Sequence, residues 1–185
     1  MFSKDQFIED CKSAAEEGQS AVRAVVERAV SDPAAIMREL GAPEVAGIEP
    51  IYHSDSLTIL NVIWPPFMSV TPHNHNMYAV IGLYTGREDN AFWRQKDGEI
   101  EIAGGKSIGV GDAETLGRDI IHSVLNPINK KTAAIHVYGG DLMSPLNDRM
   151  QWDAETLKPA PLDMDDVKHR FAEFGQRYDQ WEKQA

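Results

Sequence analysis

The chain has one cysteine, Cys11, in 185 residues, and more acidic than basic side chains. A single cysteine excludes an intrachain disulfide and a cysteine-rich zinc site. Lys and Arg number 18 against 29 Asp and Glu, which gives a formal charge of −11. Because nucleic acids and anionic membranes bind basic surfaces, this imbalance argues against both as partners. We therefore expect a small-molecule ligand, and any metal must be held by His, Asp or Glu.

Long hydrophobic runs are also missing. No apolar run reaches the about 18 residues that a membrane-spanning helix needs. The first residues, Met1 to Asp5, lack the basic segment and apolar core of a secretory signal, so a cytoplasmic location is the expectation. The length, with 42% hydrophobic and 25% charged residues, predicts one globular domain spanning 1–185.

Hydrophobic periodicity predicts helices at both ends of this domain. In an N-terminal helical segment, 1–46, apolar residues recur at i, i+3, i+4 and i+7, and the segment is expected to cover the main core. These residues are Val22, Val25, Val26 and Ala29. Asp32 as N-cap, Pro33 and Gly41 mark a further short helix. In a C-terminal helical extension, 151–185, an apolar face runs from Val167 to Trp181 and is expected to pack on the barrel or on a second subunit.

The middle segment, 47–150, changes to short β-like runs separated by Gly, Pro, Asn and Asp. Short strands at that spacing are typical of a sandwich or barrel. The predicted strands are 57–64, 77–84, 90–95, 99–102, 106–110, 120–125 and 132–138.

Three histidines in this segment form the most informative pattern of the chain. Successive strand residues face opposite ways, so His73 and His75 are predicted to share one face of a strand. His122 lies on a separate predicted strand and could complete a site assembled by the fold. Three imidazoles suit Fe, Zn, Ni and other transition metals and leave positions open for substrate. The alternative is that the three are polar barrel residues hydrogen-bonded to backbone.

The surrounding residues resemble the two sequence motifs of the cupins. The matching residues are Pro72-His73-x-His75, Gly86, Gly111-Asp112 and His122-x-Val124-x-Asn126. The resemblance implies a mainly β chain, folded as a double-stranded β-helix (jelly-roll barrel) with a metal inside. Many cupins carry a glutamate shortly after the second histidine, where Ala79 and Val80 stand here. This difference implies a site of three histidines only.

A narrower resemblance is to the bacterial thiol dioxygenases, which include cysteine dioxygenase and 3-mercaptopropionate dioxygenase. It rests on Trp64-Pro65-Pro66, His73-x-His75-x-x-Tyr78 and Ile135-His136-Val137-Tyr138-Gly139-Gly140. It implies Fe(II) held by His73, His75 and His122, and conversion of a small thiol with O2 to a sulfinate. It also implies that His136 and Tyr138 form a catalytic hydrogen-bond relay, in which Tyr138 donates a hydrogen bond to the thiolate or the oxygen beside it.

The departures from that family affect the relay and the substrate clamp. The serine that usually begins the Ser-x-His-x-Tyr relay is Ala134, and the cysteine that some relatives crosslink to the tyrosine corresponds to about Val80. The arginine of cysteine dioxygenase would fall near Tyr52, whereas that of the mercaptopropionate enzymes is matched, a couple of residues displaced, by Arg149. We assign substrate binding to Arg149. The alternatives at barrel strands are Arg87, Arg94 and Arg118.

Other interpretations of these residues stay open. The chain could be a metal-binding cupin of non-oxidative function, either a small-molecule sensor or an isomerase-like enzyme with Zn, Ni or Mn. It could also be a homo-oligomeric scaffold whose metal is structural and has no open coordination position. His136 and Tyr138 could belong to a core strand with a satisfied histidine. Glu88 and Asp89 are interpreted as a solvated turn, and His53 and His169 as bystanders.

Overall fold

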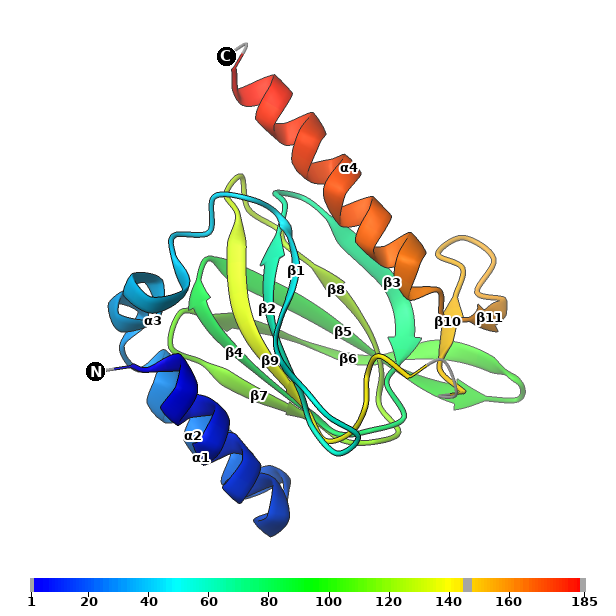
Figure 1. The fold of residues 1–185 in the computed structure, drawn as a ribbon. Coiled ribbons are helices and arrows are strands. Elements are labelled where there is room, and N and C mark those ends of the chain that lie inside the picture. Colours follow the sequence, from blue (N-terminus) through cyan, green and yellow to red (C-terminus); the bar gives the residue numbers. More distant parts are fainter. Residues whose placement is uncertain (1, 145–147, 184–185) are drawn as a thin grey trace.

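The computed structural model describes residues 2–144 and 148–183 as two antiparallel sheets with helices at both ends (Figure 1). The first sheet has the order β1-β2-β9-β4-β7, and the second β11-β10-β3-β8-β5-β6. Strands of the first sheet are β1 (Gly47–His53), β2 (Thr58–Trp64), β4 (Ala79–Thr85), β7 (Ala113–Leu116) and β9 (Thr132–Tyr138). Strands of the second are β3 (Ser69–Asn74), β5 (Arg87–Lys96), β6 (Glu99–Gly109), β8 (Ile121–Leu125), β10 (Met150–Trp152) and β11 (Pro159–Pro161).

The strand order defines the fold. The chain passes back and forth between the sheets, so that β2-β9-β4-β7 in one sheet faces β3-β8-β5-β6 in the other. Eight antiparallel strands in this arrangement form a jelly roll, the double-stranded β-helix. The predicted mainly β barrel with N-terminal helices and a C-terminal helix is therefore confirmed.

Two details of the predicted strands were wrong. The runs 99–102 and 106–110 belong to one strand, β6, because extended backbone continues through Gly104 and Gly105. The register shifts between the pairs Phe92–Gly104 and Trp93–Ile102, so Ala103 of β6 is the extra residue that has no partner in β5. His73 and His75 do not share a strand either, because β3 ends at Asn74. His75 lies in the segment that leads to β4.

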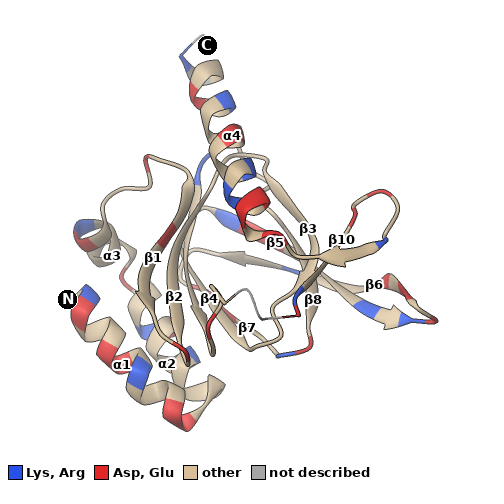
Figure 2. Cartoon of the chain, turned by 45° about the vertical axis from the view of Figure 1, so that its right-hand side comes forward, with Lys and Arg blue, Asp and Glu red and all other residues tan. Residues whose placement is uncertain are grey.

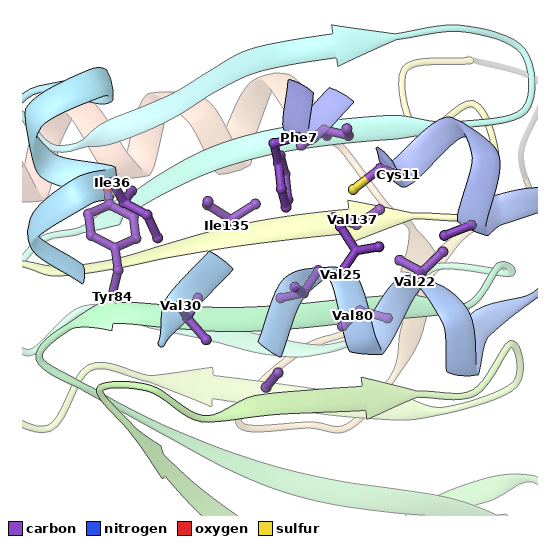
Figure 3. Close-up of a cluster of buried hydrophobic side chains, with 14 of the residues drawn as sticks. Phe7, Cys11, Val22, Val25, Val30, Ile36, Val80, Tyr84, Ile135 and Val137 are labelled. Atoms are coloured by element: carbon purple, nitrogen blue, oxygen red, sulfur yellow. The ribbon is translucent and has the colours of Figure 1, made fainter. Parts of the chain in front are cut away.

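Helices α1 (Lys4–Glu17), α2 (Gln19–Val30) and α3 (Pro33–Leu40) cover the outer face of the first sheet (Figure 3). The predicted cap of α3 is confirmed, since the Asp32 side chain accepts a hydrogen bond from the Ala35 N–H and Gly41 ends the helix with φ of 89°. A cluster of buried side chains fills the interface. It includes Phe7, Cys11, Val22, Val25, Val30, Ile36, Val80, Ile135 and Val137.

The glycine at position 82 lets α2 approach the sheet closely. A Cβ atom there would lie 2.4 Å from the Cγ1 atom of Val26 and 2.8 Å from that of Val30. Both valines are fully buried on α2. A side chain at position 82 would therefore push the helix off β4.

The first sheet is covered on both faces, which explains why β2 and β9 are buried along their whole length. On β9, Ile135 and Val137 pack under the helices, whereas Ala134, His136 and Tyr138 alternate with them and face the barrel interior. The opposite sides of one strand thus serve the helical layer and the interior.

The C-terminal helix α4 (Met164–Glu182) covers the barrel with its first half. Asp163 caps it by accepting hydrogen bonds from the N–H groups of Asp165 and Asp166. Val167 and Phe171 are buried, and the Phe171 ring centroid lies 4.8 Å from that of Trp64 on β2. The second half projects beyond the sheets (Figure 1).

Charged side chains of both signs are interspersed over α1 and α4 (Figure 2). Most ion pairs lie at the surface, as between Arg94 and Glu101 at the β5–β6 hairpin. Within the described ranges, no helix is both long enough and apolar enough to cross a bilayer.

Candidate metal centre

Three buried histidines meet inside the barrel. His73 on β3 lies directly opposite His122 on β8 in the strand pairing, and their ring centroids are 4.6 Å apart. The ring of His75, just past the end of β3, lies 5.0 Å from each of the other two. One nitrogen from each ring lies within 4.8 Å of the others, a spacing at which all three could ligate one ion.

Hydrogen bonds to the far side of two rings fix which nitrogen faces the centre. The Nδ1 atom of His73 lies 2.9 Å from the Thr71 carbonyl oxygen, and that of His122 lies 2.8 Å from Oδ1 of Asn90. Since both acceptors carry no proton, Nδ1 must donate, which leaves Nε2 as an unprotonated lone pair. The Nε2 atom of His122 is buried without a hydrogen-bond partner in the described part of the chain. Such an atom needs a ligand such as a metal ion.

The electrostatics of the cluster favour neutral imidazoles. Burial lowers the pKa of His73, and lowers those of His75 and His122 further because neighbouring rings cannot all be charged. Neutral imidazole is the form that ligates a metal. No acidic side chain of the described residues joins the cluster. The residues therefore fit a transition-metal ion held by nitrogen donors alone.

His136 and Tyr138 lie beside this cluster on β9. The Nδ1 atom of His136 is 3.0 Å from the Tyr138 hydroxyl, and the Tyr138 ring centroid is 5.0 Å from that of His75. Burial raises the pKa of the Tyr138 phenol and lowers that of His136 to about 3, so both are neutral near pH 7. Ala134, at the position of the missing serine, is buried and offers His136 no side-chain partner.

The interpretation of Glu88 as part of a solvated turn is wrong. Glu88 is the second residue of β5 and is 0% exposed, whereas the next residue, Asp89, pairs with Arg87 at the surface at 2.8 Å. Oε1 of Glu88 accepts a hydrogen bond from Nδ2 of Asn90 at 2.9 Å. Burial raises the pKa of Glu88 to about 7, while the Asn90 hydrogen bond opposes this shift.

Sequence reasoning missed Glu88 because a carboxylate that lies next to Asp89, and close to Gly86, suggested an exposed turn. The signal that could have found it is the alternation from Glu88 to Asn90, which places both side chains on the inward face if the strand begins at Arg87. Asn90 in turn positions His122.

Arg149 is buried without a carboxylate partner. It is 6% exposed, its Nη2 atom donates to the Ser144 carbonyl oxygen at 3.4 Å, and its Nε and Nη1 atoms have no hydrogen-bond partner among the described residues. Burial lowers its pKa from 12.5, with Tyr138 and Asp141 opposing the shift. A buried guanidinium with free donors is costly unless an anion binds it. Its planar donors match a carboxylate.

The alternative arginines lie elsewhere. Arg87 and Arg94 pair with acidic side chains at the surface, and Arg118 is exposed. Tyr52, near the position expected for the arginine of cysteine dioxygenase, lines a separate hollow beside α1. Arg149 is thus the arginine that reaches the histidine cluster among residues that the structure describes.

One cavity connects these groups. Its polar lining consists of the three clustered histidines, His136, Tyr138 and Arg149, and its walls are otherwise apolar. The apolar lining residues are Ile48, Leu60, Val62, Trp64, Val70, Val124, Leu142, Leu162, Met164, Val167 and Phe171. An apolar cavity with a few convergent polar groups is typical of a small-molecule site.

The two histidines interpreted as bystanders lie outside this cavity. His53 pairs with Asp141, with its Nε2 atom 2.6 Å from Oδ1, and His169 is exposed on α4. Neither belongs to the group of potential ligands.

No protein family model matches the chain, and no curated protein matches it. Among solved structures, it is similar to an RmlC-like cupin family protein with a double-stranded β-helix fold from Methanocaldococcus jannaschii, with a TM-score of 0.45, 11% identity, and coverage of 54% of this chain and 84% of that one. It is also similar to a protein of Bacillus halodurans (TM-score 0.47, 14% identity, 51% and 70% covered). Oxalate decarboxylase from Bacillus subtilis gives a TM-score of 0.42, 17% identity, and coverage of 53% and 24%. The strand order, not these distant likenesses, defines the fold.

Proposed function

We propose that the chain is a mononuclear non-heme Fe(II) thiol dioxygenase that oxidises a small, carboxylate-bearing thiol with O2 to a sulfinate. The observation that carries this proposal is the meeting, in one apolar cavity, of three neutral imidazoles, the His136–Tyr138 pair and the buried guanidinium of Arg149, whose Nε and Nη1 atoms have no partner among the described residues. Each group matches one need of the reaction: a metal site, a hydrogen-bond donor at the reacting atoms, and a clamp for the substrate.

His73, His75 and His122 would hold the metal through the nitrogens that converge in the cavity. When bound, Fe(II) supplies a dication that lowers the pKa of a thiol and a redox centre for activating O2. Neutral imidazoles leave the ion's charge uncompensated, which favours an anionic thiolate. Zn, Ni or Mn would also suit these donors, so the choice of Fe(II) is part of the proposal.

Arg149 would bind the substrate carboxylate. Its Nε and Nη1 donors are buried and have no partner among the described residues, so a carboxylate would satisfy them and neutralise the buried charge. The described lining of the cavity contains no acidic side chain that could pair with an ammonium group. A mercapto acid without an amine, such as 3-mercaptopropionate, therefore fits this lining better than cysteine does.

Tyr138 would act on the reacting atoms through its hydroxyl. His136 holds that hydroxyl at 3.0 Å, and the ring packs edge-on against His75. A neutral phenol can donate a hydrogen bond to the thiolate or to O2 as it takes up charge, which stabilises the developing anion. In the overall reaction both oxygen atoms of O2 enter the product, sulfur is oxidised and oxygen reduced. No further reductant is required.

The apolar walls would keep bulk water out. Val167 and Phe171 of α4 cover the cavity, with Phe171 packed on Trp64. Exclusion of water strengthens electrostatic interactions in the site and limits loss of reactive oxygen species. A purely structural metal gains less support, because structural sites are closed, whereas this cluster borders a cavity.

The test is oxygen consumption by the iron-loaded protein. The protein would first be loaded with Fe(II) under anaerobic conditions. It would then be mixed with O2 and one thiol at a time, namely 3-mercaptopropionate, cysteine, cysteamine or sulfide, and the products would be identified by mass spectrometry. We expect uptake with 3-mercaptopropionate, one sulfinate formed per O2, and a much weaker response to cysteamine, which lacks the carboxylate. A His122→Ala variant serves as control. Absence of uptake with every thiol would overturn the proposal in favour of a non-oxidative metal protein.

A further inference from the structure

Two buried polar atoms without partners face each other between the two sheets. Oε2 of Glu88 on β5 and Nε2 of His136 on β9 each have no hydrogen-bond partner in the described structure, and they lie 4.0 Å apart. Both side chains are almost fully buried. Unpartnered buried polar atoms are rare and costly, so two that face each other are candidates for a shared proton. The indole N–H of Trp64, also without a partner among the described residues, acts on the same carboxyl group and lowers its pKa. The gap exceeds a hydrogen bond by about 1 Å, so the contact inferred below requires a shift of one of the two side chains.

We propose that Glu88 is a positioning residue that sets, through His136, the direction of the hydrogen bond made by the Tyr138 hydroxyl. The inference rests on the proposed function only in one respect, namely that the Tyr138 hydroxyl donates its hydrogen bond to a bound substrate. Glu88 would replace, from another strand, the side-chain partner that Ala134 cannot provide.

The direction follows from the two nitrogens of one neutral ring. When Glu88 is ionised, it accepts a hydrogen bond from His136 Nε2–H, so Nδ1 carries a lone pair and accepts the Tyr138 proton. The phenol is then turned away from the cavity. When Glu88 is protonated, it donates to Nε2, and Nδ1–H donates to the Tyr138 oxygen. The phenol proton is then free to point at a ligand. The two states differ by one proton, which is taken from or released to water.

Asn90 gives the carboxyl group a fixed orientation. Its Nδ2 donates to Oε1 of Glu88 at 2.9 Å, while its Oδ1 accepts from Nδ1 of His122 at 2.8 Å. Oε1 is therefore occupied, and Oε2 is the oxygen that faces His136. The same contacts link the relay to one candidate metal ligand. In a Glu88→Gln variant, Oε1 would keep the Asn90 bond, so the amide NH2 would face His136 as a permanent donor.

The groups whose charges act on this pair come from several elements. Asp89 on β5 disfavours a charge on Glu88, His73 on β3 disfavours one on His136, and Arg149 acts on Tyr138. His75 and His122 also interact with His136. Burial, the largest influence, raises the pKa of Glu88 to about 7 and lowers that of His136 to about 3. Proton exchange near neutrality thus falls on the carboxyl group, with the ring neutral throughout.

The test reads the tautomer of His136 by nitrogen-15 NMR in metal-free protein with labelled histidine. We expect Nδ1–H at low pH and Nε2–H at high pH, with the change near neutrality, and Nδ1–H at every pH in Glu88→Gln. The neighbouring surface carboxylate supplies a matched control, Asp89→Asn, which should still change tautomer, at a somewhat lower pH because Asp89 no longer disfavours a charge on Glu88. A tautomer independent of pH in the wild type, the same change in Glu88→Gln, or a doubly protonated ring near pH 7 would overturn the inference.

Loading with Zn(II) adds a second arm that needs no oxidation chemistry. A dication in the histidine cluster favours ionised Glu88, so the tautomer change should move to lower pH. In iron-loaded protein, the pH profile of kcat should flatten in Glu88→Gln, whereas Asp89→Asn should keep a pH dependence that is moved to somewhat lower pH. If thiols are not oxidised but the tautomer still changes, the proposed function fails and this inference stands. If thiols are oxidised but the tautomer of His136 does not change with pH, the proposed function stands and this inference fails.

Discussion

His73 and His122 lie directly opposite each other across the β3–β8 ladder, with ring centroids 4.6 Å apart, although strands β4 to β7 lie between them in the sequence. The hydrogen bonds from their Nδ1 atoms to Thr71 and Asn90 orient both rings toward a common centre. The strand pairing thus places two of the three candidate ligands side by side.

Removing one of these rings should abolish metal binding. We expect His122→Ala to bind Fe(II) or Zn(II) at least about 100-fold more weakly, because two imidazoles remain from the set of three. Equilibrium dialysis with metal analysis measures this. His53→Ala, which removes a surface histidine paired with Asp141, should bind like the wild type. Equal affinity of both variants would show that the cluster does not hold the metal.

Replacing the buried guanidinium should affect carboxylate-bearing thiols only. We expect Arg149→Met to raise KM for 3-mercaptopropionate about 100-fold, since a buried charge pair with the carboxylate is lost. Oxidation of cysteamine should change little, because it has no carboxylate. Stability against urea should not fall, since the substitution removes a buried charge that pairs with no carboxylate of the described residues.

Arg94→Met serves as the control for that experiment, because Arg94 pairs with Glu101 at the surface. A similar rise in KM in both variants would remove Arg149 from the substrate site.

Stability should depend on pH through Glu88. Its pKa rises from 4.5 to about 7 on folding because the side chain is buried, so the folded chain keeps a proton that the unfolded chain loses. Its contribution to stability is therefore complete below pH 4.5 and is lost as pH rises through about 7. Glu88→Gln removes this dependence. As pH rises from 4.5 to about 7, we expect the free energy of unfolding of the variant to increase relative to that of the wild type by up to about 3 kcal/mol.

Urea unfolding of metal-free wild type and variant at several pH values measures this difference. The lowered pKa of His136 has the opposite effect, destabilising the fold as pH falls, and it acts in both proteins. A constant difference between the proteins across the range would show that the Glu88 pKa is not raised.

A side chain at position 82 should separate α2 from the barrel. The Cβ atom of Gly82→Ala would lie 2.4 Å from Val26, which is fully buried and has no room to move. We expect a loss of about 1–3 kcal/mol in the free energy of unfolding. Gly104→Ala is the matched control, since no atom lies within 4 Å of a Cβ there. Equal stability of both variants would contradict the close packing of α2 on β4.

Periodicity predicted the helices and most strands because each depends on local spacing. Val22, Val25 and Val26 recur at helical spacing and pack on the sheet, and β9 reads as continuously apolar because the sheet is covered on both faces. Strands β1, β7, β10 and β11 were not predicted. The last three have only three or four residues each, and β1 and β11 contain prolines, which weaken the strand pattern.

The site was predictable only in part. His73 and His75 suggested a metal site by their spacing, but which strand supplies the third histidine depends on pairing between distant segments, which local pattern does not give. His122 was a candidate because it lies on a separate predicted strand, and family resemblance supplied His136 and Tyr138. Glu88 was missed because a carboxylate is normally exposed, and only the start of β5 at Arg87 turns it inward.

The most direct test of the central claim is iron X-ray absorption of the Fe(II)-loaded protein, before and after 3-mercaptopropionate is added without oxygen. Because the cavity offers three imidazoles and no cysteine, the first spectrum should show nitrogen and oxygen neighbours of the iron and no sulfur neighbour. One sulfur neighbour should appear in the second, and not in Arg149→Met at the same thiol concentration. A spectrum of the wild type that stays unchanged at saturating thiol would contradict the account.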